Sequence, residues 1–213
     1  MKENGFDYVD LGLPSGTMWA TCNVGADKPE DEGLLFQFGR VDGYRFGDAN
    51  HKFRVNKQNK QDTGDEYIPK TSSSKLYGKN DILDLEDDAA HVNMGGRWRM
   101  PTKNELKELL DNTTQKETTI NGVRGILFTS NINGHQLFIP FTQGYWYNYK
   151  YYGEIPDLYV WSSQVNDYNG DSGVRLNSSL HDFVTMYQEF RTHAISVRGV
   201  FKKYIYILGV IIY

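Results

Sequence analysis

The sequence predicts an α+β protein, and three observations carry this prediction. Two segments near the middle of the chain have helix signatures, apolar runs with strand character flank them, and Gly, Asn and Ser are frequent enough for long loops. At 213 residues the chain is long enough to bury a core. No internal repeat is evident, so we expect residues 1–213 to form a single domain.

The expected strands begin close to the start of the chain. Residues 8–26, YVDLGLPSGTMWATCNVGA, predict a strand, a Pro-Ser-Gly turn and a second strand through Trp19 and Cys22. Residues 34–39, LLFQFG, predict a further strand. Residues 40–80 are polar with few apolar anchors, which predicts a long surface insertion rather than a linker between domains.

The first expected helix covers residues 85–96, LEDDAAHVNMGG. Its apolar residues Leu85, Ala89 and Val92 fall at helical spacing, acidic residues crowd the first turn, and Gly95 supplies a stop.

A second helix is expected to begin at Thr102, because Glu105 three residues later completes a capping box. Leu106, Leu109 and Leu110 then form one apolar stripe, so we expect both helices to pack on the sheet. The strands that follow are predicted in residues 124–140, where two apolar runs meet at Asn133-Gly134. That dipeptide is typical of a type I′ hairpin turn.

Composition excludes several classes of protein. The net charge of −4 argues against a nucleic-acid binder held by phosphate contacts. Cys22 is the only cysteine, so neither an internal disulfide nor a cysteine-based zinc site can form. The start of the chain lacks the apolar run of a secretory signal, and the apolar tail 204–213, YIYILGVIIY, is too short to span a bilayer. We expect that tail to be a terminal strand, buried in the core or against a neighbouring subunit.

We expect no catalytic site, metal or cofactor. The five histidines form no Ser-His-Asp order and no metal cluster; they are His51, His91, His135, His181 and His193. Oxygen ligands for calcium occur in residues 29–33, PEDEG, and 154–157, EIPD. Solvated acids are the favoured interpretation of both.

Several motifs together resemble one known family. They are GGRWRMPTKNELKELL, EDDAA, YVDLGLPSGTMWATCNVGA, WSS and SVRGV, and they lie within residues 8–200. In this order they resemble the Fibrobacter succinogenes major paralogous domain, a family abundant in gut Bacteroidetes and their phages. The resemblance implies a C-type lectin-like fold related to formylglycine-generating enzymes, with two helices, a small twisted, mostly antiparallel sheet and long loops.

Some relatives of that family are the variable proteins of diversity-generating retroelements. In those proteins a fixed WSS precedes the variable binding segment and a fixed SVRPV closes it. Here Trp161-Ser162-Ser163 and the residues 196–200 hold these places, with Gly199 where Pro is usual. The resemblance therefore implies a binding segment at 164–193, followed by an extension at 201–213. We interpret six other residues as framework: Trp19, Trp98, Arg99, Pro101, Trp161 and Arg198.

The candidate binding residues lie in that segment and mix Tyr, Arg and Phe with polar groups, as interface hot spots do. They are Tyr168, Asp171, Arg175, His181, Phe183, Tyr187, Gln188, Phe190 and Arg191. The alternative is that Phe183, Met186 and Phe190 are ordinary core residues. Residues 142–161, rich in Tyr and Trp, are open to two interpretations as well: a carbohydrate platform, or packing under the loops.

The function expected from the residues and the resemblance is non-enzymatic recognition of a protein or glycan on a bacterial surface. One form is a retroelement variable protein of a Bacteroidetes phage or its host, extracellular or on the virion, with the tail at 201–213 contacting a second copy or a virion protein. The alternatives are a Bacteroidetes adhesin or carbohydrate-binding lipoprotein module, and a divergent formylglycine-generating-enzyme-like enzyme. The last would need a second thiol or metal ligand.

Overall fold

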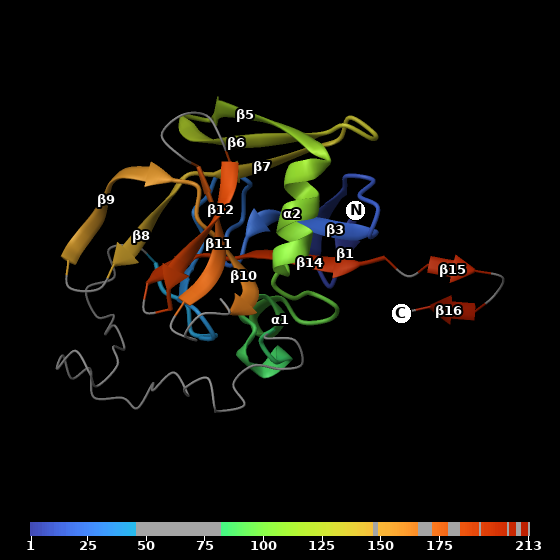
Figure 1. Cartoon of the computed structure of the whole chain (residues 1–213), viewed down its shortest axis with the longest axis horizontal. Helices are drawn as coiled ribbons and strands as arrows, with labels where there is room; N and C mark the ends of the chain where they lie inside the picture. Colours follow the sequence, from blue (N-terminus) through green and yellow to red (C-terminus); the bar gives the residue numbers. More distant parts are fainter. Residues whose placement is uncertain are drawn as a thin grey trace.

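A computed structural model describes residues 1–45, 82–146, 149–165, 172–178, 184–191, 193–203, 205–207 and 210–212 (Figure 1). It is β-rich, with 51% strand and 13% helix, five sheets and two α-helices in this part of the chain. The predicted α+β class with a two-helix C-type lectin-like fold is therefore wrong. The predicted surface insertion lies almost wholly outside the described residues.

The predicted binding segment, residues 164–193, holds two strands that the sequence did not predict. It contains β11 (Ser172–Ser178) and β12 (Val184–Phe190), which pair antiparallel without interruption, from Ser172 opposite Phe190 to Ser178 opposite Val184. Leu176 is buried on one face of this pair and Arg175 on the other. Because Gly173, Val174, Arg175 and Leu176 are all buried, β11 is covered on both faces, and its sequence lacks the alternation that marks a half-exposed strand.

The first strands of the chain share a sheet with a late one. Its order is β1-β2-β3-β14, made from β1 (Lys2–Glu3), β2 (Phe6–Asp10), β3 (Thr17–Asn23) and β14 (Arg198–Lys202). β2 and β3 confirm the strands expected in residues 8–26. Arg99 bridges to Val200 on β14, and the rings of Trp98 and Phe201 meet edge to face at 4.8 Å.

The remaining strands form four other sheets. One has the order β4-β13-β8-β9, from β4 (Leu35–Gln37), β13 (Ala194–Ser196), β8 (Thr142–Trp146) and β9 (Tyr149–Asp157). Another joins β10 (Val160–Val165) to β11 and β12. At the top of Figure 1 lie β5 (Thr113–Ile120), β6 (Val123–Ser130) and β7 (Gln136–Pro140). A separate pair consists of β15 (Ile205–Ile207) and β16 (Val210–Ile212).

The hairpin predicted at Asn133-Gly134 exists as β6 and β7, but its turn is not type I′. Only Gly134 has a positive φ, of 75°, and the loop is held by the Asp10 carbonyl, which accepts from the Asn133 side chain at 3.0 Å. The two-residue turn with positive φ at both positions is Asn121-Gly122, at 49° and 86°, between β5 and β6. The dipeptide Asn-Gly thus occurs in both kinds of turn in this chain. The longer turn, at Asn133-Gly134, is the one that contacts Asp10.

The first helix differs from its prediction. A 3₁₀ turn covers Leu85–Asp87, and α1 covers only Ala89–Met94, because the side chain of Asp88 caps it by accepting from the His91 amide at 2.9 Å. The buried residues of α1 are Ala89, Ala90 and Met94, and α1 lies against β14. Leu85 and Val92 are about half exposed, so the predicted apolar stripe is wrong.

The second helix confirms its prediction. α2 covers Lys103–Asp111, with Thr102 as N-cap and both hydrogen bonds of the capping box to Glu105. Leu106 and Leu109 are fully buried in a cluster that includes Leu176, and α2 packs against β10, β11 and β12. A second cluster gathers around Trp98 and Trp161.

A buried ion pair fixes the start of α2. The carboxylate of Glu105 accepts from both terminal nitrogens of Arg99, at 2.7 and 2.6 Å, and from the Thr17 hydroxyl at 3.1 Å. Burial acts to raise the pKa of Glu105, but the hydrogen bonds and charge of Arg99 outweigh burial and bring the pKa to about 2.

This pKa predicts a specific acid sensitivity. Since the folded pKa is about 2 and the ordinary value is 4.5, the stabilisation is present above pH 4.5 and is lost as the pH falls through about 2. The ionised Glu105 side chain contributes roughly 3 kcal/mol to the free energy of unfolding. About 2 kcal/mol of this contribution should be lost at pH 3. Urea unfolding at pH 6 and pH 3 should show the free-energy gap between wild type and Glu105→Gln narrowing by that amount. A gap that stays constant would contradict the assignment.

Candidate functional site

The two motifs that bracket residues 164–193 lie in the interior. Trp161 is fully buried; its ring nitrogen donates to the Phe36 carbonyl at 2.8 Å. Arg198 is also fully buried and donates to the carbonyls of Ala20 at 3.2 Å and Phe138 at 3.3 Å. With Trp19 and Trp98 also at 0% exposure, the framework assignment of these four residues is confirmed. Both motifs therefore anchor the segment between them.

The structure places the candidate binding residues unevenly. Tyr168, Asp171, His181 and Phe183 lie outside the described residues, as does the side chain of Phe190. Of the remaining four, Tyr187 and Gln188 are exposed, whereas Arg175 is 6% and Arg191 1% exposed.

Arg191 is buried, and its guanidinium lies over the ring of Phe38, 5.5 Å from the ring centroid. Tyr187 and Gln188 are neighbours on β12, so they point to opposite faces of the sheet. Met186 packs with the cluster beneath α2, which agrees with the core alternative for that residue. Among the described candidates, Tyr187 is exposed and lies opposite a second candidate, Arg175, so we take the surroundings of Tyr187 as the candidate site.

Tyr187 stands over a buried cation. It is the cross-strand partner of Arg175, whose guanidinium lies 5.5 Å from the ring centroid of Tyr187 and 4.7 Å from that of Tyr159. Tyr159 is half-buried, and Tyr187 is 59% exposed. The guanidinium thus contacts Tyr159 on the core side and Tyr187 on the solvent side. Both contacts are favourable because the negative face of an aromatic ring attracts a cation.

Polar partners fix this guanidinium. Arg175 donates to Glu189 through Nε at 3.0 Å, forms an ion pair with the same carboxylate at 2.9 Å, and donates to the side-chain oxygen of Asn177 at 2.5 Å. The other carboxylate oxygen of Glu189 lies 2.6 Å from Nδ1 of His193. We call Tyr159, Arg175, Asn177, Tyr187 and Glu189 the Tyr187 face.

The floor of this face needs a glycine. Gly173 is opposite Glu189, two residues before Arg175. A Cβ there would lie 2.6 Å from Phe38 and 2.9 Å from the ring of Trp161, both buried. Glycine therefore lets the strand approach the Trp161 frame closely, which links the face to the core motif.

Burial also raises the pKa values of two groups close to Arg175, Tyr159 and Asp157. It raises the pKa of Tyr159 to about 12, with a further contribution from Asp157, so its hydroxyl stays protonated near neutral pH. Burial likewise raises the pKa of Asp157, although this carboxylate accepts from the Leu158 amide at 2.7 Å and from the Ser178 hydroxyl.

The sequence did not single out Asn177 or Glu189, and it pointed to Tyr159 only as one member of the aromatic stretch 142–161. No local signal marks them, because Arg175 and Glu189 are 14 positions apart and meet only through the register of β11 and β12. Once that pairing is known, Glu189 is seen to lie two residues from Tyr187, the cross-strand partner of Arg175. Diagonal neighbours of opposite charge at this spacing indicate an ion pair.

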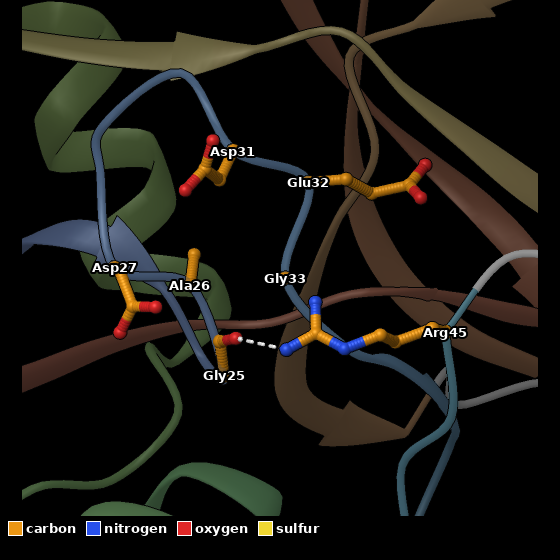
Figure 2. Close-up of a pocket in the computed structure, with 7 residues that line it drawn as sticks. All are labelled: Gly25, Ala26, Asp27, Asp31, Glu32, Gly33 and Arg45. Atoms are coloured by element: carbon orange, nitrogen blue, oxygen red, sulfur yellow. Dashed lines mark hydrogen bonds between the residues drawn. The ribbon is translucent and has the colours of Figure 1, made fainter.

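A second candidate is a polar pocket of about 420 Å³ at the loop after β3 (Figure 2). It is lined by Gly25, Ala26, Asp27, Asp31, Glu32, Gly33 and Arg45. Figure 2 shows Glu32 turned away from Arg45, and Arg45 donating to the Gly25 carbonyl, at 3.3 Å.

The pocket residues are engaged with their own loop. Asp31 accepts from the Lys28 amide at 3.2 Å, and Glu32 accepts from the Gln143 amide at 2.5 Å. Two of the three acids of the 29–33 motif, Asp31 and Glu32, line this pocket. Among the residues that the structure describes, however, no three His, Cys, Asp or Glu side chains are arranged to hold a metal. We therefore favour the Tyr187 face.

Comparisons with protein-family models, with curated proteins and with solved structures find no match. Neither helix in the described ranges is long and apolar enough to cross a membrane.

Proposed function

We propose that the protein is a non-enzymatic binding protein whose recognition surface is centred on the Tyr187 face. Its partner would be a protein or glycan on a bacterial cell surface. The observation that carries the proposal is the exposed ring of Tyr187 held above a buried, fully paired Arg175.

Preorganisation supports this proposal. Tyrosine supplies a large contact area with few rotatable bonds, so little conformational entropy is lost when it is buried in an interface. Here its strand pairs along its full length with β11, and its ring already contacts the guanidinium of Arg175. Binding hot spots of this kind are typically rigid aromatic residues on a fixed scaffold.

The charge of the face points to the chemistry of the partner. Glu189 balances the charge of Arg175 within the protein, at 2.9 Å. The face therefore offers an aromatic ring and neutral polar groups rather than a net charge. Such a surface suits a ligand with an apolar face and hydrogen-bonding edges, such as a sugar ring or a neutral peptide loop, better than a polyanion.

Four other candidate residues flank β11 and β12 in the sequence. Tyr168 and Asp171 precede β11 in the chain, and His181 and Phe183 lie between β11 and β12. The resemblance to retroelement variable proteins, with its frame at Trp161-Ser162-Ser163 and residues 196–200, supports the same stretch as the binding segment. A phage or host surface protein is the form that we propose.

Replacing Tyr187 tests the proposal. Tyr187→Ala should weaken binding by about 2 kcal/mol or more, near a thirtyfold loss of affinity, because the ring supplies the central contact. Its effect on the free energy of unfolding should stay within roughly 1 kcal/mol, the value of one exposed cation–π contact. Binding would be measured on a glycan array and on whole bacterial cells.

Two matched variants complete this experiment. Tyr187→Phe keeps the ring and should retain most of the affinity, while Gln188→Ala changes the exposed neighbour on the opposite face and should leave binding unchanged. If wild type binds a cell and Tyr187→Ala binds it equally well, the proposed surface is wrong.

A further inference from the structure

His193 connects two sheets beside the Tyr187 face. It directly precedes β13, whose first residue, Ala194, is fully buried and pairs with Gln37 of β4. Glu189 lies on β12, in the sheet β10-β11-β12. Nδ1 of His193 is 2.6 Å from Oε1 of Glu189, so this contact joins the start of β13 to the end of β12.

The carboxylate of Glu189 is divided between two partners. Oε2 accepts from Nε of Arg175 at 3.0 Å and pairs with a terminal nitrogen of Arg175 at 2.9 Å, whereas Oε1 faces His193. The three side chains are largely shielded from water, with 7% of Arg175, 8% of Glu189 and 13% of His193 exposed. Because a buried carboxylate is stable only when its oxygens are paired and hydrogen-bonded, the contact on Oε1 complements the ion pair on Oε2.

This geometry assigns the proton of the imidazole. A carboxylate that is ionised beside Arg175 accepts hydrogen bonds and cannot donate one, so the contact requires a proton on Nδ1 of His193. The distance of 2.6 Å is short, as hydrogen bonds to charged groups are. His193 therefore fixes Glu189 as a donor, which an apolar side chain of similar size could not do.

The position of Glu189 in turn decides where the guanidinium of Arg175 lies. Glu189 holds this group together with the side-chain oxygen of Asn177, which accepts from Arg175 at 2.5 Å. The guanidinium is thereby kept 4.7 Å from the ring centroid of Tyr159 and 5.5 Å from that of Tyr187. Since the attraction between a cation and a ring requires a separation within about 6 Å, a small displacement of the guanidinium would release the ring of Tyr187.

We propose that His193 is a positioning residue for the Tyr187 face, which it supports by fixing Glu189 and thereby the guanidinium of Arg175. A binding surface needs such supporting contacts to keep its exposed residues in place. The value of this support to a partner rests on the proposed function, whereas the positioning itself is a property of the free protein.

The test compares two variants of His193 by NMR of the full chain, without any ligand. His193→Leu removes the Nδ1 donor, whereas His193→Asn places an amide nitrogen close to the same point. In the leucine variant the Arg175 Nε–H proton should exchange with solvent roughly tenfold faster or more, and the ring signals of Tyr187 should shift. The asparagine variant should keep both observables close to those of wild type.

Two controls separate positioning from a general loss of stability. The ring N–H of Trp161, which donates to the Phe36 carbonyl in the core, should exchange at an unchanged rate in both variants. His135→Leu makes the same substitution at an exposed histidine, whose Nδ1 lies 2.7 Å from the Asp10 carbonyl, and should leave the signals of the Tyr187 face unchanged.

Three results would overturn the proposal. The first is an Arg175 Nε–H proton that exchanges in His193→Leu as slowly as in wild type. The second is an equal acceleration at Arg175 and Trp161, which would mean that His193 only stabilises the fold. The third is an asparagine variant that behaves like the leucine variant.

A measurement on wild type needs no substitution. The nitrogen chemical shifts of His193 show which ring nitrogen carries the proton, and at neutral pH Nδ1 should carry it. A proton on Nε2 alone would also overturn the proposal. If the NMR signals respond as expected but wild type binds no glycan or cell, the proposed function is wrong and the positioning role of His193 stands.

Discussion

Trp161→Ala should lower the free energy of unfolding by about 3–5 kcal/mol, as is usual when a large aromatic ring is removed from a core. The ring is fully buried and meets Phe38 edge to face at 5.3 Å. Truncation would also leave the Phe36 carbonyl without the donor that now lies 2.8 Å away. The cavity would open beneath Gly173, so the floor of the Tyr187 face should loosen as well.

Urea unfolding of three proteins measures this effect. Trp161→Phe keeps part of the ring volume and should lose less stability than Trp161→Ala, and Tyr187→Ala should lose least. The reverse order, with Tyr187→Ala the more damaging, would mean that the frame and the surface have been assigned the wrong way round.

Glu105→Ala should cost about 3 kcal/mol, because it breaks a buried ion pair and a capping box together. The Glu105 side chain is 7% exposed and that of Arg99 26%, so the guanidinium would keep partial access to water and the loss should lie at the lower end of the range for buried pairs.

The same helix provides a matched control. Lys107 and Asp111 form an i,i+4 pair at 2.5 Å, with side chains 61% and 55% exposed. Asp111→Ala should change the free energy of unfolding by within about 0.5 kcal/mol, since exposed pairs contribute little. Equal losses in the two variants, measured by urea unfolding, would contradict the role given to burial.

The sequence predicted those elements whose determinants are local. α2 was predicted almost to the residue because its cap, Thr102 with Glu105, and its stripe, Leu106 with Leu109, lie within one short window. β3 was predicted for a similar reason, since a Pro-Ser-Gly turn separates it from β2. In both cases neighbouring residues decide the conformation.

The prediction of the fold class was wrong in a segment whose conformation depends on residues that are far apart in the sequence. β11 and β12 carry Arg175 and Glu189 at positions where a strand would ordinarily show an apolar or an exposed residue, and the pair is buried because each charge satisfies the other. A pattern search reads such a segment as aperiodic. No strand was therefore expected in this segment, and the strand content of the chain was underestimated.

The candidate site was predicted in part. Arg175 and Tyr187 were both named from the sequence, but Arg191, chosen for the same reason, is buried under Phe38. Residue type alone does not separate an arginine that lies beneath an exposed ring from one that packs against a buried ring. The register of the strands makes that distinction.

The pairing of β3 with β14 has a consequence for how the protein is made. Met18 on β3 is the partner of Phe201 on β14, and the fully buried Arg198 on β14 donates to the carbonyl of Ala20. A nascent chain on the ribosome cannot form these contacts until residues 198–202 have left the exit tunnel. The strand Thr17–Asn23 therefore lacks this partner while the residues between β3 and β14 are being made, and during that time it is open to aggregation.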